Sequence, residues 1–460
     1  SINIFIKKKQ KSKKLADVYH YDLYGKRDFK YEFLDENNLK TIKWEKLDYS
    51  EPNYFFVKKD FTDVKEYEKG FKLDELFLIY SSTIESAKDQ VVINFEEKEL
   101  YKVKHNFSTK NIDDLKQIYS ISNDKINQVK NDIENTTINK VDYRPFDSRY
   151  ILYSENSQGV LWRPKVKVTK HFLLNNIGII FERGNKDKEF RQLFISENLS
   201  EVHLLGTMNS KAYTAPLYLY PDENSLTNEP VPNFNMDIIK DIEKSLNLNF
   251  GNWTLVQSLE KIGGTEVPLP KEKAGGTEVL LPKEKIGESE VLLPKKEFQA
   301  LDLFDYIYAV LHSPSYREKY KEFLKIDFPR VPYPKPETFW QLVSLGGKLR
   351  SLHLLEDTSL DERIIDIKGD GELLIKNSLN KKDFSVEDEK VELRLNDEVS
   401  VVNIPLVAWE FYIGGYQPAQ KWLKDRVGRV LNRADMKHYN RIINALCKTD
   451  LIMKKIDEVL

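Results

Sequence analysis

Basic side chains at regular spacing are the groups in this sequence best suited to chemistry, and they suit contact with phosphates and base edges. In the segment WRPKVKVTKH, Arg163, Lys165 and Lys167 occupy alternate positions. Alternate side chains of a β-strand point to one face. We therefore expect a positive stripe on one strand, which Lys170 and His171 extend. A solvated strand followed by a turn is the alternative interpretation.

Two further arginines lie in VDYRPFDSRY, where Arg144 and Arg149 flank Asp147. The planar guanidinium group can read guanine or hold a phosphate through two parallel hydrogen bonds. The alternative is a buried ion pair between Arg144 and Asp147 across the proline turn. Of the two arginines, we expect Arg149 to face DNA.

Two loops add polar groups of the same kind. The glycine-containing segment ERGNKDKEFRQ, where a backbone could approach phosphates, contributes Arg183, Lys186, Lys188 and Arg191. Asparagine can make two hydrogen bonds to adenine, and lysine can reach guanine or phosphate. The polar turn of GTMNSKAYTAPLYLY accordingly contributes Asn209, Ser210, Lys211 and Tyr213. For the first loop, an ordinary solvated turn is the alternative.

Catalytic and metal-binding patterns are missing from the sequence. A DNA amino-methyltransferase needs an (Asp/Asn/Ser)-Pro-Pro-(aromatic) motif to hold the flipped base, and the nearest match, SPSY, has serine at the second proline. Because SPSY follows an apolar helical pattern, we predict Ser313 as an N-cap and Pro314 as the first residue of the next helix. There is no Walker-type glycine loop and no His-x3-His pair. We therefore predict no catalytic, cofactor-binding or metal-binding residues.

Composition indicates an ordinary globular protein with room for two or three domains. The chain has 460 residues, 40% of them hydrophobic, and its net charge of −2 conceals 71 basic and 73 acidic side chains. A nucleic-acid surface would therefore need segregated charge. The single cysteine, Cys447, cannot form an internal disulfide, and no run of about 18 apolar residues occurs. We expect a cytoplasmic protein.

The hydrophobic patterns predict an α+β fold, with two β-rich units flanking a helical centre and a low-complexity repeat inserted between them. Residues 108–136 have helical spacing, and Ser108 and Ser122 are predicted N-caps of two short helices. Three consecutive dodecapeptides rich in Gly and Pro span residues 261–296. Each offers little to a core, so we predict a surface linker, with a small stack of β-turns as the alternative.

Three segments carry a family resemblance, in this order: VDYRPFDSRY (141–150), the aromatic and basic stretch from Leu303 to Leu355, and FYIGGYQPAQKWLKDRVGR (411–429). Together they resemble the C-terminal target-recognition region of type ISP and type IIG adenine-specific DNA methyltransferases. The resemblance implies sequence-specific recognition of double-stranded DNA in a bacterial restriction-modification system. It also implies a partner domain upstream in the same polypeptide, which would bind S-adenosylmethionine.

The resemblance and the patterns together predict six segments. Residues 1–14 would end a truncated methyltransferase domain, and no methyl transfer is expected of the chain itself. The others are a mixed α/β part (15–140), a β-rich target-recognition unit (141–255), a repeat linker (256–297), a helical segment (298–355) and C-terminal strands and helices (356–460).

One departure concerns STIESAKD (82–89), where the family often has a basic loop and this chain has Glu85 and Lys88 at the basic positions. The reversed charge at Glu85 weakens any expected DNA contact there. Two other functions stay open: a scaffold module that docks methyltransferase to nuclease, and a carbohydrate- or peptide-binding protein. Only DNA recognition requires a continuous positive cleft about as wide as a duplex.

Overall fold

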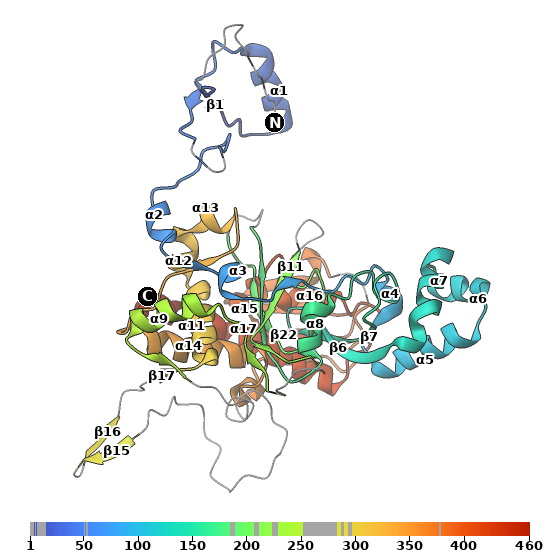
Figure 1. The fold of residues 1–460 in the computed structure, drawn as a ribbon. Helices are drawn as coiled ribbons and strands as arrows, with labels where there is room; N and C mark the ends of the chain where they lie inside the picture. The colour runs from blue at the N-terminus through green and yellow to red at the C-terminus, as the bar shows by residue number, and fades with distance from the viewer. Residues whose placement is uncertain are drawn as a thin grey trace. The chain divides into compact units, whose positions relative to one another are not determined.

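A computed structural model describes residues 4, 6, 15–49, 51, 54–184, 189–206, 211–222, 229–251, 283–286, 289–292, 297–376 and 379–460. The chain divides into two compact units, residues 1–63 and 64–460. In the first, helix α1 (Arg27–Glu36) lies between the short strands β1 (Tyr19–His20) and β2 (Glu45–Lys46), which pair antiparallel (Figure 1). A stacked ring pair, Tyr21 and Phe33, joins the β1 end to α1.

The second unit contains three four-stranded sheets in the part of the chain that is described, which confirms the α+β class. The first sheet has the order β10-β6-β7-β5, with β5 Ile93–Asn94, β6 Thr137–Arg144, β7 Asp147–Tyr153 and β10 Leu199–Ser200. The second has the order β4-β11-β8-β9, with β4 Ser81–Ser82, β8 Gly178–Glu182, β9 Leu193–Ser196 and β11 Ala212–Pro216.

Four helical elements share a core with the first sheet: α4 (Asp89–Val92), α5 (Glu97–Thr109), α6 (Ile112–Tyr119) and α7 (Asn123–Asp132), followed by the 3-10 turn η1 (Ile133–Asn135). Helices α4 and α5 pack against the sheet itself. The predicted pair of short helices is confirmed, and Ser122 caps α7 by accepting a hydrogen bond from Lys125 N. Ser108 is not a cap. It lies inside α5 and donates to Lys104 O, while Asn111 caps α6.

The central helices are α11 (Ala300–His312), α12 (Pro314–Lys319), α13 (Lys321–Leu324) and α14 (Phe339–His353). Ser313 Oγ accepts a hydrogen bond from Tyr316 N at 3.0 Å, and Pro314 is the first residue of α12, as predicted. Helix α11 is buried on nearly every side. The 27-residue helix α17 (Arg433–Val459) packs against α11 and α14.

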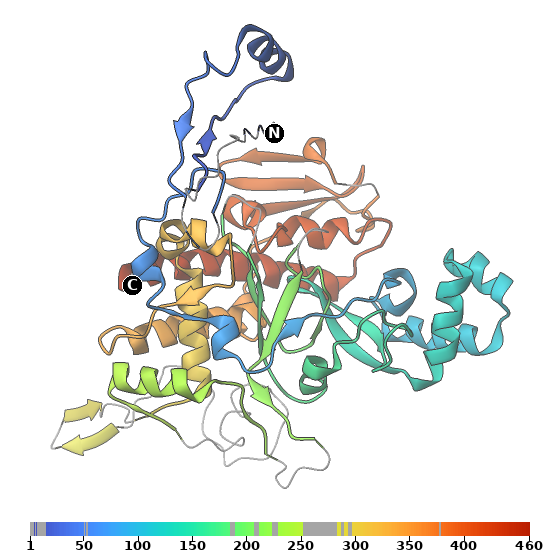
Figure 2. The same cartoon turned by 45° about the horizontal axis from the view of Figure 1, so that its top comes forward.

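The third sheet has the order β19-β22-β21-β20, with β19 Asp366–Lys368, β20 Phe384–Glu387, β21 Lys390–Arg394 and β22 Ser400–Pro405. It lies along α17 (Figure 2), with α15 (Leu406–Glu410) and α16 (Pro418–Lys424) beside it. Residues 371–376 belong to no named strand, although Leu374 makes a single bridge to Val430.

Shorter elements complete the unit: α2 Val64–Tyr67, β3 Phe71–Lys72, α3 Leu73–Leu76, α8 Val166–Thr169, η2 Lys170–Phe172, β12 Tyr218–Leu219, β13 Val231–Pro232, α9 Met236–Leu246, β14 Asn249–Phe250, β17 Glu297–Phe298, β18 Arg330–Val331, η3 Thr358–Asp361 and η4 Lys381–Asp383. Most of the predicted repeat linker lies outside the described residues. Across the junction of its second and third copies, β15 (Lys283–Ile286) pairs antiparallel with β16 (Ser289–Leu292). No described helix is long and apolar enough to cross a membrane.

Candidate nucleic-acid interface

Three loops emerge at one end of the second sheet because of its register. Tyr213 in β11 lies opposite Ser82 in β4 and Phe181 in β8, and Ala212 lies opposite Glu182. Three segments therefore meet at the same end of the sheet, which we call the sheet edge: the segments that follow β4 and β8 and the segment that precedes β11. Loops held at one edge of a rigid sheet commonly carry binding residues.

Glu85, just after β4, holds two of the predicted cations at this edge. Its carboxylate Oε1 accepts a hydrogen bond from Lys211 Nζ at 2.7 Å and pairs with an Arg163 guanidinium nitrogen at 3.5 Å. The backbones of Glu85 and Arg163 form an antiparallel bridge, with N–H donated in both directions. The side chains of Arg163 and Lys211 are 52% and 50% exposed, whereas that of Glu85 is only 17% exposed.

The electrostatics of this group, which we call the Glu85 cluster (Glu85, Arg163, Lys165 and Lys211), keep the carboxylate charged. Burial alone would raise the pKa of Glu85, but the Lys211 hydrogen bond and the charges of Lys211, Arg163 and Lys165 together lower it. Burial lowers the pKa of Lys165. Three cations and one anion leave a local net charge of about +2, directed toward solvent.

The predicted strand through Arg163, Lys165 and Lys167 is wrong. Arg163 makes only the bridge to Glu85, Lys165 has a left-handed backbone (φ 61°), and Lys167 lies exposed in the four-residue helix α8. Proline at position 164 lacks the N–H that a strand ladder needs. The three cations therefore share no strand face, although two of them meet again around Glu85.

The predicted extension of the stripe consists of one partly exposed residue, Lys170, and one buried residue, His171. Lys170 forms an ion pair with Asp222. His171 is buried, its Nδ1 accepts a hydrogen bond from Tyr220 N, and burial lowers its pKa to about 4. A neutral buried histidine cannot supply positive charge at neutral pH.

Arg183, which directly follows β8, and Tyr213 of β11 lie next to the Glu85 cluster in the register of the second sheet. The Arg183 guanidinium is 61% exposed, lies over the Phe328 ring at 5.6 Å and pairs with Asp327 at 3.0 Å. Tyr213 packs against Phe181 and Phe328. The other predicted loop residues, Lys186, Lys188, Asn209 and Ser210, lie outside the described residues.

The arginines of VDYRPFDSRY are placed differently. Arg144 pairs with Glu201 at 2.8 Å, and not with Asp147 as the alternative interpretation had it. Asp147, 1% exposed, pairs with Arg149 at 2.7 Å and with Arg426 at 2.8 Å. Burial raises the pKa of Asp147, but the two guanidinium groups outweigh it and lower the pKa. Arg149 also pairs with Asp425 at 3.3 Å and is only 12% exposed, so its predicted orientation toward DNA has no support in the geometry.

These contacts join the three segments that carry the family resemblance. Arg426 and Asp425 belong to the last segment and Asp147 and Arg149 to the first. Phe146 of the first segment packs edge-on against His353 of the central one, with ring centroids 5.8 Å apart. In the last segment, Gly414 N donates to Arg191 O and Gly415 N to Leu205 O, which fixes the chain just before residues 207–210. We call Asp147, Arg149, Asp425 and Arg426 the ionic frame.

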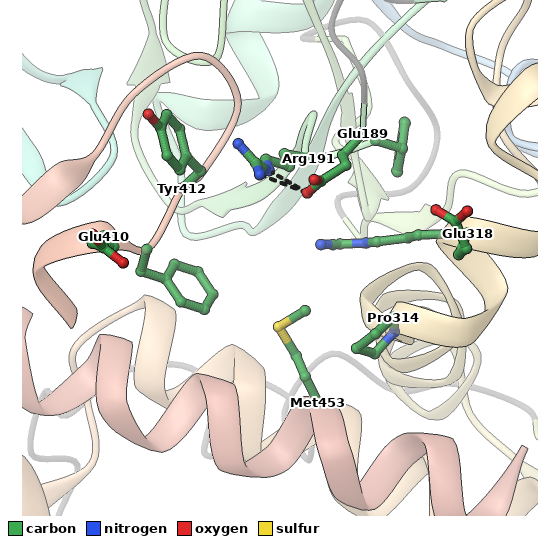
Figure 3. Close-up of a pocket in the computed structure, with 10 residues that line it drawn as sticks. Glu189, Arg191, Pro314, Glu318, Glu410, Tyr412 and Met453 are labelled. Carbon is green, nitrogen blue, oxygen red and sulfur yellow. Dashed lines mark hydrogen bonds and ion pairs between the residues drawn. The ribbon is translucent and has the colours of Figure 1, made fainter. Parts of the chain in front are cut away.

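Arg191 lines a cavity of about 290 Å³ between the β8–β9 loop, α12, the segment after α15 and α17 (Figure 3). It is held by Glu189 through two hydrogen bonds and stacks on Tyr412 at 4.2 Å. In the same cavity, Arg317 donates from Nε to Leu311 O in the last turn of α11. A cation beside a helix C-terminus is stabilising, so Arg317 has a structural role. Arg191 is 31% exposed, and its contact with DNA stays a prediction.

Sequence reasoning missed the organising role of Glu85, which it treated only as a weakened contact. It also missed Asp327, which holds both Arg183 and Lys72. No local pattern signals either acid, because the partners are distant in sequence. Lys88, at the other expected basic position, is buried, and burial lowers its pKa to about 8.

Comparison with known proteins identifies the family to which this fold belongs. The model of the type ISP C-terminal specificity domain matches residues 75–455, so the chain belongs to that family. No curated protein matches the chain in a sequence search.

Three solved structures share the fold. The chain resembles a nuclease-deletion mutant of the type ISP restriction-modification enzyme LlaGI in complex with a DNA substrate mimic (18% identity, TM-score 0.60, 96% of this chain and 39% of that one). It also resembles the ATP-dependent type ISP enzyme LlaBIII bound to DNA (16% identity, TM-score 0.60, 91% of this chain and 26% of that one). A third similar structure is a DrdV–DNA complex (17% identity, TM-score 0.63, 96% of this chain and 44% of that one). The chain thus spans less than half the length of each.

Proposed function

We propose that this chain recognises a specific double-stranded DNA sequence on behalf of an adenine-specific methyltransferase of a bacterial restriction-modification system. The observation that carries the proposal is the gathering of exposed cations from three segments at one sheet edge: Arg163, Arg183 and Lys211. The family membership and the DNA complexes of the three similar proteins support it.

In the proposed mechanism, different residues bind the DNA backbone and recognise the bases. Cations of the Glu85 cluster and Arg183 contact phosphates, which positions the duplex without regard to sequence. Polar side chains of the adjoining loops then meet the base edges, where lysine, arginine and asparagine distinguish bases. The ionic frame contacts no DNA in this scheme and keeps the loop-bearing sheets in place.

The catalytic step belongs to a methyltransferase domain of the same polypeptide, with S-adenosylmethionine as its cofactor. This part of the proposal rests on the family, whose known structures are longer than this chain. We also infer a cytoplasmic location, since a chain with the single cysteine Cys447 builds no internal disulfide.

The test begins with selection of bound sequences from a random duplex library by the full chain. The selected duplex is then titrated across salt concentrations with the variant Arg163→Ala/Lys165→Ala/Lys211→Ala. Each lost phosphate contact lowers the slope of log affinity against log salt by about 0.9, so we expect a slope reduced by up to about 3 and an unchanged circular dichroism spectrum.

A matched control removes three exposed cations, Lys368 and Arg394 of the third sheet and Lys376 of the segment between β19 and β20: Lys368→Ala/Lys376→Ala/Arg394→Ala. These side chains are 66%, 54% and 57% exposed, and each pairs with an acid. The control variant should bind as the wild type does. No enrichment of any sequence would contradict sequence-specific recognition, and equal losses in both variants would contradict the placement of the interface.

A further inference from the structure

The Glu85 carboxylate occupies the position that an external anion would take beneath two exposed cations. Both Lys211 Nζ and the Arg163 guanidinium contact the same oxygen, Oε1, at 2.7 and 3.5 Å. An oxygen of a DNA phosphate meets lysine and arginine at similar distances. The carboxylate therefore neutralises part of the charge that would otherwise attract the duplex.

The backbone holds this carboxylate in place independently of the cations. Glu85 N donates to Arg163 O at 3.1 Å, and Arg163 N and Trp162 N donate to Glu85 O at 3.0 and 2.9 Å. The side chain is only 17% exposed, so it cannot move far from the two cations. Arg163 and Lys211, by contrast, are about half exposed and have room to reorient.

The pairing is weak enough for DNA to compete with it. Ion pairs whose cation is about half exposed contribute little, since water and salt screen them. A polyanion that releases counterions gains more from each cation than one carboxylate does. The competition still lowers the affinity for every duplex that binds through phosphates alone.

We propose that Glu85 is a built-in competitor of DNA phosphates, which limits binding of the chain to non-target duplex. This inference rests on the proposed function, because it assumes that Arg163 and Lys211 contact DNA. Glu85 is then a residue that sets specificity through two other side chains, without reading a base itself.

The test compares full-length wild type with Glu85→Gln, which keeps the shape and the backbone bridge and removes the charge. With a random-sequence duplex at about 0.1 M salt, we expect about threefold to tenfold tighter binding, the order expected for removing one screened like charge near a phosphate. The gain should shrink as salt rises. The matched control is Glu392→Gln, whose partner Lys368 lies on the third sheet at 3.0 Å, and no gain is expected there.

A second pair of variants separates this inference from the proposed function. In a Lys211→Ala/Arg163→Ala background, Glu85→Gln should give little gain, since the phosphate no longer docks beside residue 85. Unchanged or weaker binding by Glu85→Gln, while Lys211→Ala/Arg163→Ala loses affinity, would overturn the competitor role and leave the interface standing. If Lys211→Ala/Arg163→Ala binds DNA as the wild type does, the interface assignment itself fails. Thermal melting verifies that each variant folds.

Discussion

Around Asp147, four charged side chains lie below the surface, whereas two of the cations around Glu85 are about half exposed. In the ionic frame the exposed fractions are 1% for Asp147, 12% for Arg149, 17% for Asp425 and 8% for Arg426. In the Glu85 cluster the carboxylate of Glu85 is as shielded as that of Asp425, at 17% exposed, but the side chains of Arg163 and Lys211 are 52% and 50% exposed. The difference lies in hydration and not in residue type.

This difference assigns the two regions opposite roles. A buried charge without its partner costs several kcal/mol, so the ionic frame must stay paired and cannot offer its arginines to a ligand. A pair whose cation is about half exposed contributes little to stability, and that cation can exchange one anion for another. Arginine-rich motifs therefore predict a DNA contact only where water already reaches the guanidinium.

The largest effect should follow from breaking the ionic frame. Asp147→Asn removes the charge that both Arg149 and Arg426 contact, and leaving a buried charge unpaired costs about 3–5 kcal/mol. We expect a loss of this order in urea unfolding. The control is Asp222→Asn, an acid that is 80% exposed and pairs with Lys170, and its midpoint should not change. Equal midpoints for Asp147→Asn and the wild type would contradict the structural role of the frame.

A smaller effect is expected in the pH dependence of folding stability, through the buried residue His353. His353 packs on Phe146, its Nδ1 and Nε2 contact Tyr308 Oη and Thr449 Oγ1, and burial lowers its pKa to about 3. The unfolded chain, with a histidine pKa of about 6.5, binds this proton more readily than the folded chain. Stability from His353 is therefore complete above pH 6.5 and is lost as pH falls toward 3.

Comparison of wild type with His353→Gln isolates this contribution from that of Glu356, whose pKa burial raises to about 7 and whose pH dependence has the opposite sign. Between pH 7 and pH 5, the wild type should lose about 2 kcal/mol more than the variant. Urea titrations at both pH values measure the difference. Parallel losses in the two proteins would show that His353 does not titrate as proposed.

The smallest effect is expected for Lys170→Ala, which tests how far the DNA interface extends. Lys170 was predicted to contact DNA; its side chain is 35% exposed and pairs with Asp222, outside the Glu85 cluster. Lys170→Ala should leave the salt dependence of duplex binding unchanged, whereas Lys211→Ala should reduce the slope by about 0.9. A slope reduced to the same extent by Lys170→Ala would extend the interface to η2.

Local signals in the sequence were sufficient for much of the fold. The α+β class, the two helices between residues 111 and 132, the Ser122 cap and the Ser313–Pro314 helix start all follow from spacing and from side chains that bond within a few residues. The family resemblance was equally readable, and the specificity-domain match over residues 75–455 confirms it. Such features involve neighbours in the chain, which a sequence displays directly.

Partners distant in sequence were decided only by the tertiary structure. Arg144 pairs with a residue 57 positions away and Asp147 with one 279 positions away, so no local motif could show which arginine is buried. The expected strand at Arg163–Lys167 failed because alternation alone supplies no partner strand, and Pro164 removes a donor. Glu85 gathers Lys211 from 126 positions away. The sequence gives the charged residue types. The tertiary structure determines which charged side chains are buried and which stay hydrated, and hydration decides whether they stabilise the fold or can bind DNA.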